Sequence, residues 1–168
     1  RESRKSTTGF ALMHGRHCLK MGSSNQTTIA MSSGEAELYA VVRGASEGLG
    51  LQALADDLGV KRSVRIWTDS TAAKGMVSRT GARKQRHLEV KYLWAQEAHR
   101  RKKFQVCKIA GERNPADVLT KAMAHADMKD KIYTVGGRFL ESSRVNTNEG
   151  RASWYDLTEA EWLKGDDY

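Results

Sequence analysis

Apolar and polar residues first alternate along this chain. Residues 9–14 and 17–21 are two short apolar-rich runs separated by Gly15-Arg16, a pattern that predicts a β-hairpin with a tight two-residue turn. The polar stretch 23–28 follows and predicts a loop. We therefore expect the chain to begin with two antiparallel strands.

A helical repeat of apolar positions follows this loop. Ser32 with Glu35 three residues later forms a capping-box pattern, and Gly59 suits a helix C-terminus, so a long helix is predicted between them. Glycines inside this stretch weaken a helix, or they allow close packing against a sheet. The expected buried stripe is Leu38, Val41, Val42, Ala45, Leu49 and Leu54, and the interior glycines are Gly44, Gly48 and Gly50.

Shorter elements are predicted after residue 63. Asn114 and Pro115 have the residue types of an N-cap and a first helical position. The pattern predicts strands at 64–68 and 104–109, helices at 69–76 and 87–101, a helix from Pro115 that continues through Ala122, a helix at 124–132 and a short strand within 132–140. This order indicates an α/β fold with a mixed sheet in a domain of residues 1–132. Residues 133–168 are expected to form an acidic, partly disordered tail.

Composition adds a charge asymmetry to this picture. The chain of 168 residues has a net charge of +8, and no apolar run is long enough to span a membrane. Ten Lys or Arg and two Glu lie between residues 79 and 108, whereas residues 141–168 carry seven acids and three bases. A concentrated basic segment is typical of nucleic-acid binding, and a solvated helix face is the alternative. Cys18 and Cys107 are expected to be buried free thiols in a reducing, intracellular compartment.

Three acidic residues stand at the ends of predicted elements. Glu37 is in the first turns of the long helix, Asp69 follows the strand 64–68, and Asp117 is in the first turn after Pro115. Each has an ordinary explanation, because Asp is a common N-cap and acids are favoured in the first turn of a helix. Carboxylates at element ends also converge readily in α/β folds, where they can bind a divalent metal.

The sequence around these acids resembles the ribonuclease H domain of copia-type LTR retrotransposon polyproteins. The resemblance extends from residue 4 to about residue 123, and its segments occur in the order of that family. The matching segments are Arg4-Lys-Ser-Thr-Thr-Gly-Phe, Ser32-Ser-Gly-Glu-Ala-Glu-Leu-Tyr-Ala, Trp67-Thr-Asp-Ser-Thr-Ala-Ala, Arg86-His-Leu-Glu-Val-Lys-Tyr and Asn114-Pro-Ala-Asp-Val-Leu-Thr-Lys.

The resemblance implies a ribonuclease H-like mixed sheet flanked by helices, and two-metal hydrolysis of the RNA strand of RNA–DNA hybrids. By this resemblance Glu37, Asp69 and Asp117 are catalytic metal ligands for two Mg²⁺ ions, with Mn²⁺ as an alternative metal and Glu35 as the competitor for Glu37. The implied partners are an RNA–DNA hybrid and the remainder of a reverse transcriptase polyprotein. Candidate contacts to nucleic acid are Arg83, Lys84, Arg86 and Lys91, together with the polar stretch 24–28, whereas Trp67 and Trp94 are expected in the core.

The chain also departs from the family. The family's first catalytic Asp lies on a central strand upstream of the Lys5-Ser-Thr-Thr-Gly segment, and here only residues 1–4 precede that segment. We therefore expect an N-terminally incomplete domain with unpaired strand edges and weak activity. The alternatives are an inactive, decayed or co-opted module that binds nucleic acid, and a fragment with no function of its own.

Overall fold

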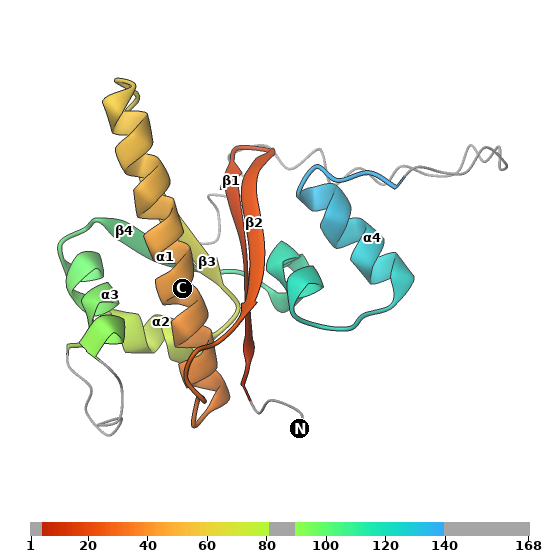
Figure 1. The fold of residues 1–168 in the computed structure, drawn as a ribbon, viewed down its shortest axis with the longest axis horizontal. Helices are drawn as coiled ribbons and strands as arrows, with labels where there is room; N and C mark the ends of the chain where they lie inside the picture. The colour runs from red at the N-terminus through yellow and green to blue at the C-terminus, as the bar shows by residue number, and fades with distance from the viewer. Residues whose placement is uncertain (1–4, 81–89, 140–168) are drawn as a thin grey trace, which may run out of the picture.

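The computed structural model describes residues 5–80 and 90–139, which form both helices and strands (Figure 1). The elements are β1 (Thr7–His14), β2 (His17–Asn25), α1 (Ser33–Asp57), β3 (Val64–Thr68), α2 (Thr71–Ser78), α3 (Val90–Arg100), β4 (Phe104–Lys108), the 3-10 helices η1 (Gly111–Arg113) and η2 (Pro115–Leu119), and α4 (His125–Thr134). No helix in these residues has the length and apolarity needed to cross a bilayer. The predicted α/β class is confirmed at this level.

The β1–β2 hairpin forms as predicted. Its strands are antiparallel and are joined at Gly15-Arg16, where Gly15 adopts a φ of 55°. The second strand is longer than predicted, because the backbones of Ser23, Ser24 and Asn25 pair with β1. The predicted loop therefore begins only at Gln26.

Helix α1 is bounded by the expected residues. The Ser32 hydroxyl accepts a hydrogen bond from the backbone N–H of Glu35 at 3.2 Å, and Gly59 follows the last turn with a φ of 76°. Leu38, Val41 and Ala45 lie in the core as predicted. The prediction is wrong for Leu54, which is 54% exposed, because the C-terminal turns of α1 project beyond the rest of the molecule (Figure 1).

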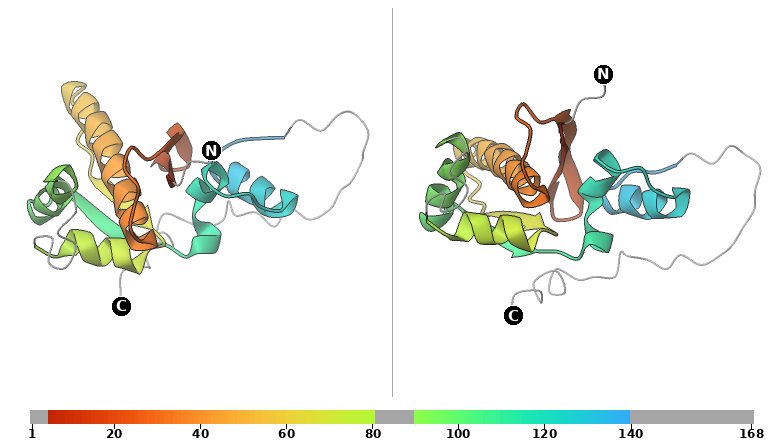
Figure 2. Two further views of the ribbon diagram at one scale, coloured as in Figure 1. Left: turned by 60° about the horizontal axis from the view of Figure 1, so that its bottom comes forward. Right: turned by 90° about the horizontal axis from the view of Figure 1, so that it is seen from below.

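The four strands form two separate sheets in the described part of the chain. β1 pairs with β2, and β3 pairs in parallel with β4 from Val64↔Phe104 to Thr68↔Lys108. No described strand joins the two sheets, so each of β1 and β3 has one unpaired edge. Helix α1 packs against both β1 and β3, and the hairpin lies between α1 and the η2–α4 segment (Figure 2).

The hydrophobic core lies under α1. Phe104 is the largest of its fully buried side chains, and β3 and β4 supply further apolar contacts. Trp94 is 42% exposed, so the prediction that it belongs to the core is wrong. The residues that contribute are Leu38, Tyr39, Val41 and Ala45 of α1, Ala73, Met76 and Val77 of α2, Ala95 and Ala98 of α3, and Phe104 and Val106 of β4.

The C-terminal part departs most from prediction. Pro115 begins a 3-10 helix of five residues instead of an α-helix through Ala122. The Asn114 side chain accepts from the backbone N–H of Ala116, which confirms its capping role. Helix α4 confirms the helix predicted at 124–132 and extends it to Thr134, across the expected domain boundary. Gly136 then takes a φ of 81°, and no strand forms in residues 132–139. The acidic tail from residue 140 onward lies outside the described residues.

Candidate active site

The two candidate acids of α1 have different surroundings. Glu35 is 1% exposed, and its carboxylate accepts hydrogen bonds from the backbone N–H of Met31 and from the Tyr39 hydroxyl. The buried Glu35 side chain therefore has a structural role at the N-terminus of α1. Glu37 is two positions further along, about 200° around the helix axis, and is partly exposed. Its carboxylate interacts electrostatically with those of Asp69 and Asp117.

Asp69 lies in the turn between β3 and α2 and is not the N-cap of α2. Ser70 fills that role, since its hydroxyl accepts from the backbone N–H of Ala73 at 3.1 Å. The Asp69 carboxylate instead lies against Gly111, where an added Cβ would be 3.4 Å from Oδ2. The Lys108 ammonium donates a hydrogen bond to the Asp69 carbonyl. The N-capping explanation for Asp69 is therefore wrong.

Asp117 is carried by η2, which lies across the hairpin. A Cβ on Gly9 would lie 2.7 Å from Cγ2 of Thr120 and 3.0 Å from the Ala116 carbonyl, so only glycine at this position allows η2 to pack so closely on β1. The Ser23 hydroxyl adds a hydrogen bond of 2.8 Å to the Leu119 carbonyl. The Lys5-Ser-Thr-Thr-Gly segment thus contributes to the position of Asp117.

The three acids share one electrostatic environment. Burial raises the pKa of Glu37, and the carboxylates of Asp69 and Asp117 raise it further, whereas the Lys121 ammonium lowers it. The hydrogen bond to Asp117 raises the pKa of Lys121, and Asp69 and Glu37 add to this effect. Three segments that are far apart in the sequence therefore carry carboxylates that lie near enough to influence one another's charge.

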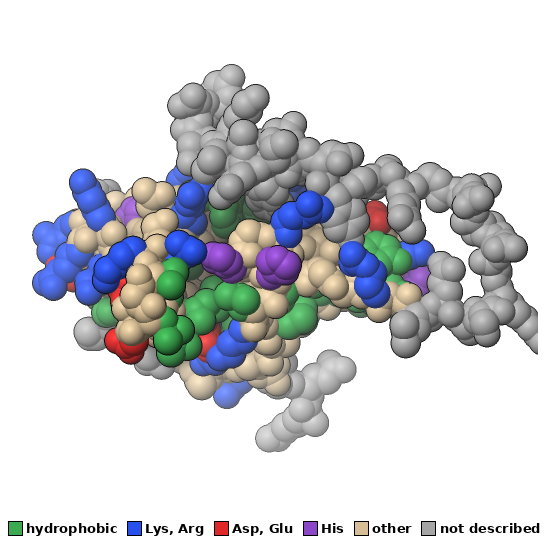
Figure 3. Space-filling view, turned by 90° about the horizontal axis from the view of Figure 1, so that it is seen from above, with side chains coloured by type: hydrophobic (Ala, Val, Ile, Leu, Met, Phe, Trp, Pro, Cys, Tyr) green, Lys and Arg blue, Asp and Glu red, His purple; other side chains and the backbone are tan. Residues whose placement is uncertain are grey.

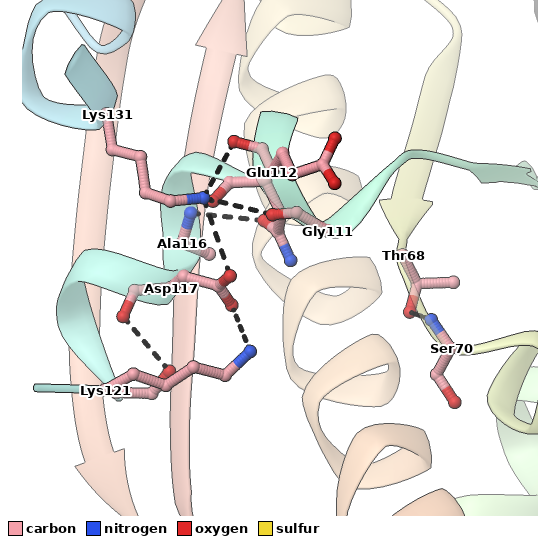
Figure 4. A network of polar contacts seen from close by, with 10 residues as sticks. Thr68, Ser70, Gly111, Glu112, Ala116, Asp117, Lys121 and Lys131 are labelled. Atoms are coloured by element: carbon pink, nitrogen blue, oxygen red, sulfur yellow. Dashed lines mark hydrogen bonds and ion pairs between the residues drawn. The ribbon is translucent and has the colours of Figure 1, made fainter. Parts of the chain in front are cut away.

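Two lysines that the sequence analysis did not single out contact Asp117 (Figure 4). The Lys121 ammonium lies 2.8 Å from Oδ1, and the Lys131 ammonium lies 3.5 Å from Oδ2. The spacing of four residues between Asp117 and Lys121 is a helical ion-pair signal that sequence inspection can find. Lys131 has no such signal, because it reaches the site from α4.

The donor chemistry of the site suits a hard divalent cation. Glu37, Asp69 and Asp117 offer carboxylate oxygens, the ligands that Mg²⁺ prefers. In residues 5–80 and 90–139, no three His, Cys, Asp or Glu side chains form a closed metal-ligand group. Both oxygens of Asp117 face lysine ammonium groups, which supply the local positive charge. The three carboxylates are therefore neighbours whose side chains must still converge to hold a metal.

Sequence comparison finds similarity to a retroelement polyprotein. It is 28% identical over 124 residues to the retrovirus-related Pol polyprotein from transposon TNT 1-94 of Nicotiana tabacum. The chain is homologous to part of this Pol polyprotein. The matched region covers 73% of the chain and 9% of the relative. No protein-family model matches the chain, and no solved structure matches it significantly.

The basic residues of this Pol homologue divide into two groups. The candidate nucleic-acid contacts Arg83, Lys84 and Arg86 lie outside the described residues, as does the side chain of Lys91. The described residues 100–103 are all Arg or Lys and are exposed, and blue side chains gather at the α3–β4 end of the molecule (Figure 3). These residues precede the N-terminal end of β4, whereas Asp69 follows the C-terminal end of the parallel strand β3. They therefore lie at the opposite end of these two strands from Asp69.

The polar stretch 24–28 has mainly a structural role at Gln26. Gln26 is buried, and its amide donates hydrogen bonds to the Thr8 hydroxyl at 3.0 Å and to the Ala36 carbonyl at 2.9 Å. It therefore ties the hairpin to the first turn of α1, close to Glu37. The prediction that this residue contacts the sugar backbone is wrong, because its amide is enclosed by protein.

Proposed function

We propose that this chain is the ribonuclease H-like part of a retroelement Pol polyprotein and hydrolyses the RNA strand of RNA–DNA hybrids. The observation that carries the proposal is the electrostatic proximity of Glu37, Asp69 and Asp117, which come from three separate segments. Homology to a Pol polyprotein supports the same conclusion. The fold class supports it too, because helix α1 packs on both a hairpin and a parallel strand pair.

In this proposal the three carboxylates hold two Mg²⁺ ions, or Mn²⁺ in their place. Divalent ions bound there would supply a water of lowered pKa and would stabilise negative charge on the phosphate oxygens and the leaving 3′ oxygen. The protein's own contribution is to fix the positions of the segments that carry the acids. Thr68 and Lys108 hold the turn that carries Asp69, and Gly9 seats the helix that carries Asp117.

A further strand between the two sheets would complete the proposed fold. β1 and β3 each have one edge with no partner in the described residues, so a strand inserted between them would satisfy the backbone groups of both. In this proposal the strand comes from the polyprotein and carries a fourth acid into the site. It would also join the two sheets into the mixed sheet implied by the family resemblance.

A second candidate function is nucleic-acid binding without cleavage. The pairing of both Asp117 oxygens with lysine ammonium groups favours it, because a metal must compete with two tethered cations for this carboxylate. In both candidates the partner is an RNA–DNA hybrid or another nucleic acid, and the chain works as part of a larger polyprotein.

A cleavage assay tests both candidates. The chain and a longer form with the preceding polyprotein sequence are incubated with an end-labelled RNA–DNA hybrid and Mg²⁺. The longer form is expected to cleave the RNA, and Asp69→Asn is expected to lower the rate by about 100-fold or more, because a metal ligand is lost. Asp57→Asn, at the exposed end of α1, is the matched control and is expected to keep full activity.

The outcomes separate the two candidates. Cleavage by Asp69→Asn at the rate of the unmutated protein would contradict the role of Asp69. Hybrid binding without cleavage in both lengths of protein would favour the binding module. If the protein neither binds nor cleaves the hybrid, both candidates are contradicted.

A further inference from the structure

Lys131 of α4 is enclosed by oxygen atoms beside the proposed site. Its ammonium donates hydrogen bonds to the backbone carbonyls of Gly111 and Glu112, both at 3.0 Å, and of Asn114 at 2.8 Å. It also lies 3.5 Å from Oδ2 of Asp117, and its side chain is 12% exposed. An ammonium has three N–H donors, and here each has a carbonyl acceptor.

The carbonyls that Lys131 binds belong to the turn between β4 and η2. This turn touches the second acid of the site, because Gly111 lies against the carboxylate of Asp69. It also leads directly into Pro115, the first residue of the helix that carries Asp117. Lys131 thus joins the turn that borders Asp69 to the carboxylate of Asp117 (Figure 4).

Lys121 provides a contrast within the same network. Its ammonium pairs with Oδ1 of Asp117 at 2.8 Å, but its side chain is 54% exposed and comes from the segment that directly follows η2. A metal can displace an exposed ammonium at small cost, since such ion pairs contribute little to stability. Lys131 is largely buried, and its ammonium is bound by three carbonyl groups. If Lys131 moves away, all three carbonyls lose their hydrogen-bond donor, so its displacement costs more free energy.

We propose that Lys131 is a positioning residue that holds Asp117 and the Gly111–Asn114 turn against Asp69. This proposal rests on the proposed function, because it assigns Lys131 to the same carboxylate site. It makes α4 part of that site, although α4 lies beyond the residues that resemble the family. Lys131 acts through Asp117 and the turn, and it neither binds the metal nor contacts the substrate.

The test compares Lys131→Met with Lys121→Met in two measurements. One is Mn²⁺ affinity, from water proton relaxation, and the other is amide hydrogen exchange of residues 111–121. Both variants remove one positive charge near Asp117, which by itself favours cation binding. Lys131→Met is nevertheless expected to weaken Mn²⁺ binding by about 10-fold, the typical cost of losing a group that orients a metal ligand, and to speed exchange in the turn. Lys121→Met is expected to bind Mn²⁺ as well as the unmutated protein or more tightly, without faster exchange in the turn.

Conservative variants separate positioning from folding. Lys131→Arg keeps the charge and the donors, so it is expected to recover most of the Mn²⁺ affinity. Lys131→Gln keeps two N–H donors and replaces Lys131→Met if that variant unfolds, with the same direction of change and a smaller size.

Three results would overturn the proposal. They are unchanged exchange in the turn, tighter Mn²⁺ binding in Lys131→Met as in Lys121→Met, and failure of Lys131→Arg to recover affinity. If neither the unmutated chain nor its longer form with the preceding polyprotein sequence binds Mn²⁺, the proposed cleavage function fails, and the exchange measurement alone then decides whether Lys131 holds the turn.

Discussion

The Glu37 carboxylate is partly buried and feels the negative charge of two other acids, so its charged form is destabilised in the folded protein. Burial raises its pKa above the ordinary 4.5, and Asp69 and Asp117 add to the shift against the opposing effect of Lys121. Between that ordinary value and the raised one, the folded protein binds more protons than the unfolded chain. The contribution of Glu37 to stability is therefore present below pH 4.5 and is lost as the pH rises through the raised pKa.

Replacing Glu37 by Gln removes this unfavourable charge. We expect the free energy of unfolding of Glu37→Gln to exceed that of the unmutated protein at pH 7, and the difference to shrink as the pH falls to about 4. Urea unfolding followed by circular dichroism at both pH values measures it. Addition of Mg²⁺ at pH 7 is expected to reduce the advantage, because a bound cation favours the charged carboxylate.

Glu47 is the contrasting control in the same helix. Hydrogen bonding and charge from Lys20, with a further contribution from Arg43, lower its pKa. The contribution of Glu47 to stability is therefore present above its ordinary pKa and is lost as the pH falls. Glu47→Gln is expected to leave the free energy of unfolding at pH 7 unchanged or slightly lower. Equal effects of the two substitutions at pH 7 would contradict the assignment of Glu37 to a shared acidic site.

At the scale of elements, the glycines of α1 have two different roles. An added Cβ at Gly48 would lie 2.8 Å from Cγ1 of Val64, so this glycine lets the helix lie directly on β3. A Cβ at Gly44 or Gly50 would meet nothing within 4 Å. The close packing that the sequence suggested therefore holds for Gly48, and the other two glycines only weaken the helix.

Alanine substitution of these glycines should change stability in opposite directions. Gly48→Ala is expected to lower the free energy of unfolding by about 1–3 kcal/mol, because Val64 or the helix must move. Gly44→Ala and Gly50→Ala are each expected to raise it by up to about 1 kcal/mol through better helix propensity. Chemical denaturation of the three variants provides the measurement. A stabilised Gly48→Ala would show that α1 does not lie this close to β3.

At the scale of the whole molecule, α1 packs against both sheets, which share no strand within the described residues. It contacts β1 on one side and β3 on the other, and the core cluster is built around its buried face. The acids also depend on it, because α1 carries Glu37 while α2, which packs on α1, follows directly after Asp69. Loss of the α1 core contact should therefore weaken both sheets together.

Leu38→Ala tests this coupling, since the Leu38 side chain is 2% exposed. The expected cost is about 2–5 kcal/mol, as for other buried leucines. Hydrogen exchange is expected to quicken in both β1 and β3. Leu58→Ala, at a side chain 74% exposed, is the control and is expected to change stability by less than about 0.5 kcal/mol. Faster exchange confined to one sheet would contradict the proposal that α1 stabilises both sheets.

Local chemistry determined most of the elements of this protein. Ser32, Gly59, Gly15 and Asn114 were predicted as caps and turns and act as such, because their hydrogen bonds or backbone angles involve residues at most a few positions away. The length of β2, the exposure of Leu54 and Trp94, and the 3-10 geometry of η2 were not predicted. Each of these depends on which other element lies alongside.

The sequence by itself also picked out Glu37, Asp69 and Asp117 through their neighbouring residues, but it left Glu35 as a competitor and N-capping as the ordinary explanation for Asp69. In the tertiary structure the Glu35 carboxylate is hydrogen-bonded at the start of α1, the Glu37 carboxylate feels the charges of Asp69 and Asp117, and Ser70 is the cap of α2. Lys131 was beyond the reach of sequence reasoning. Its partners lie on another element, and only the docking of α4 brings its ammonium to their carbonyl groups.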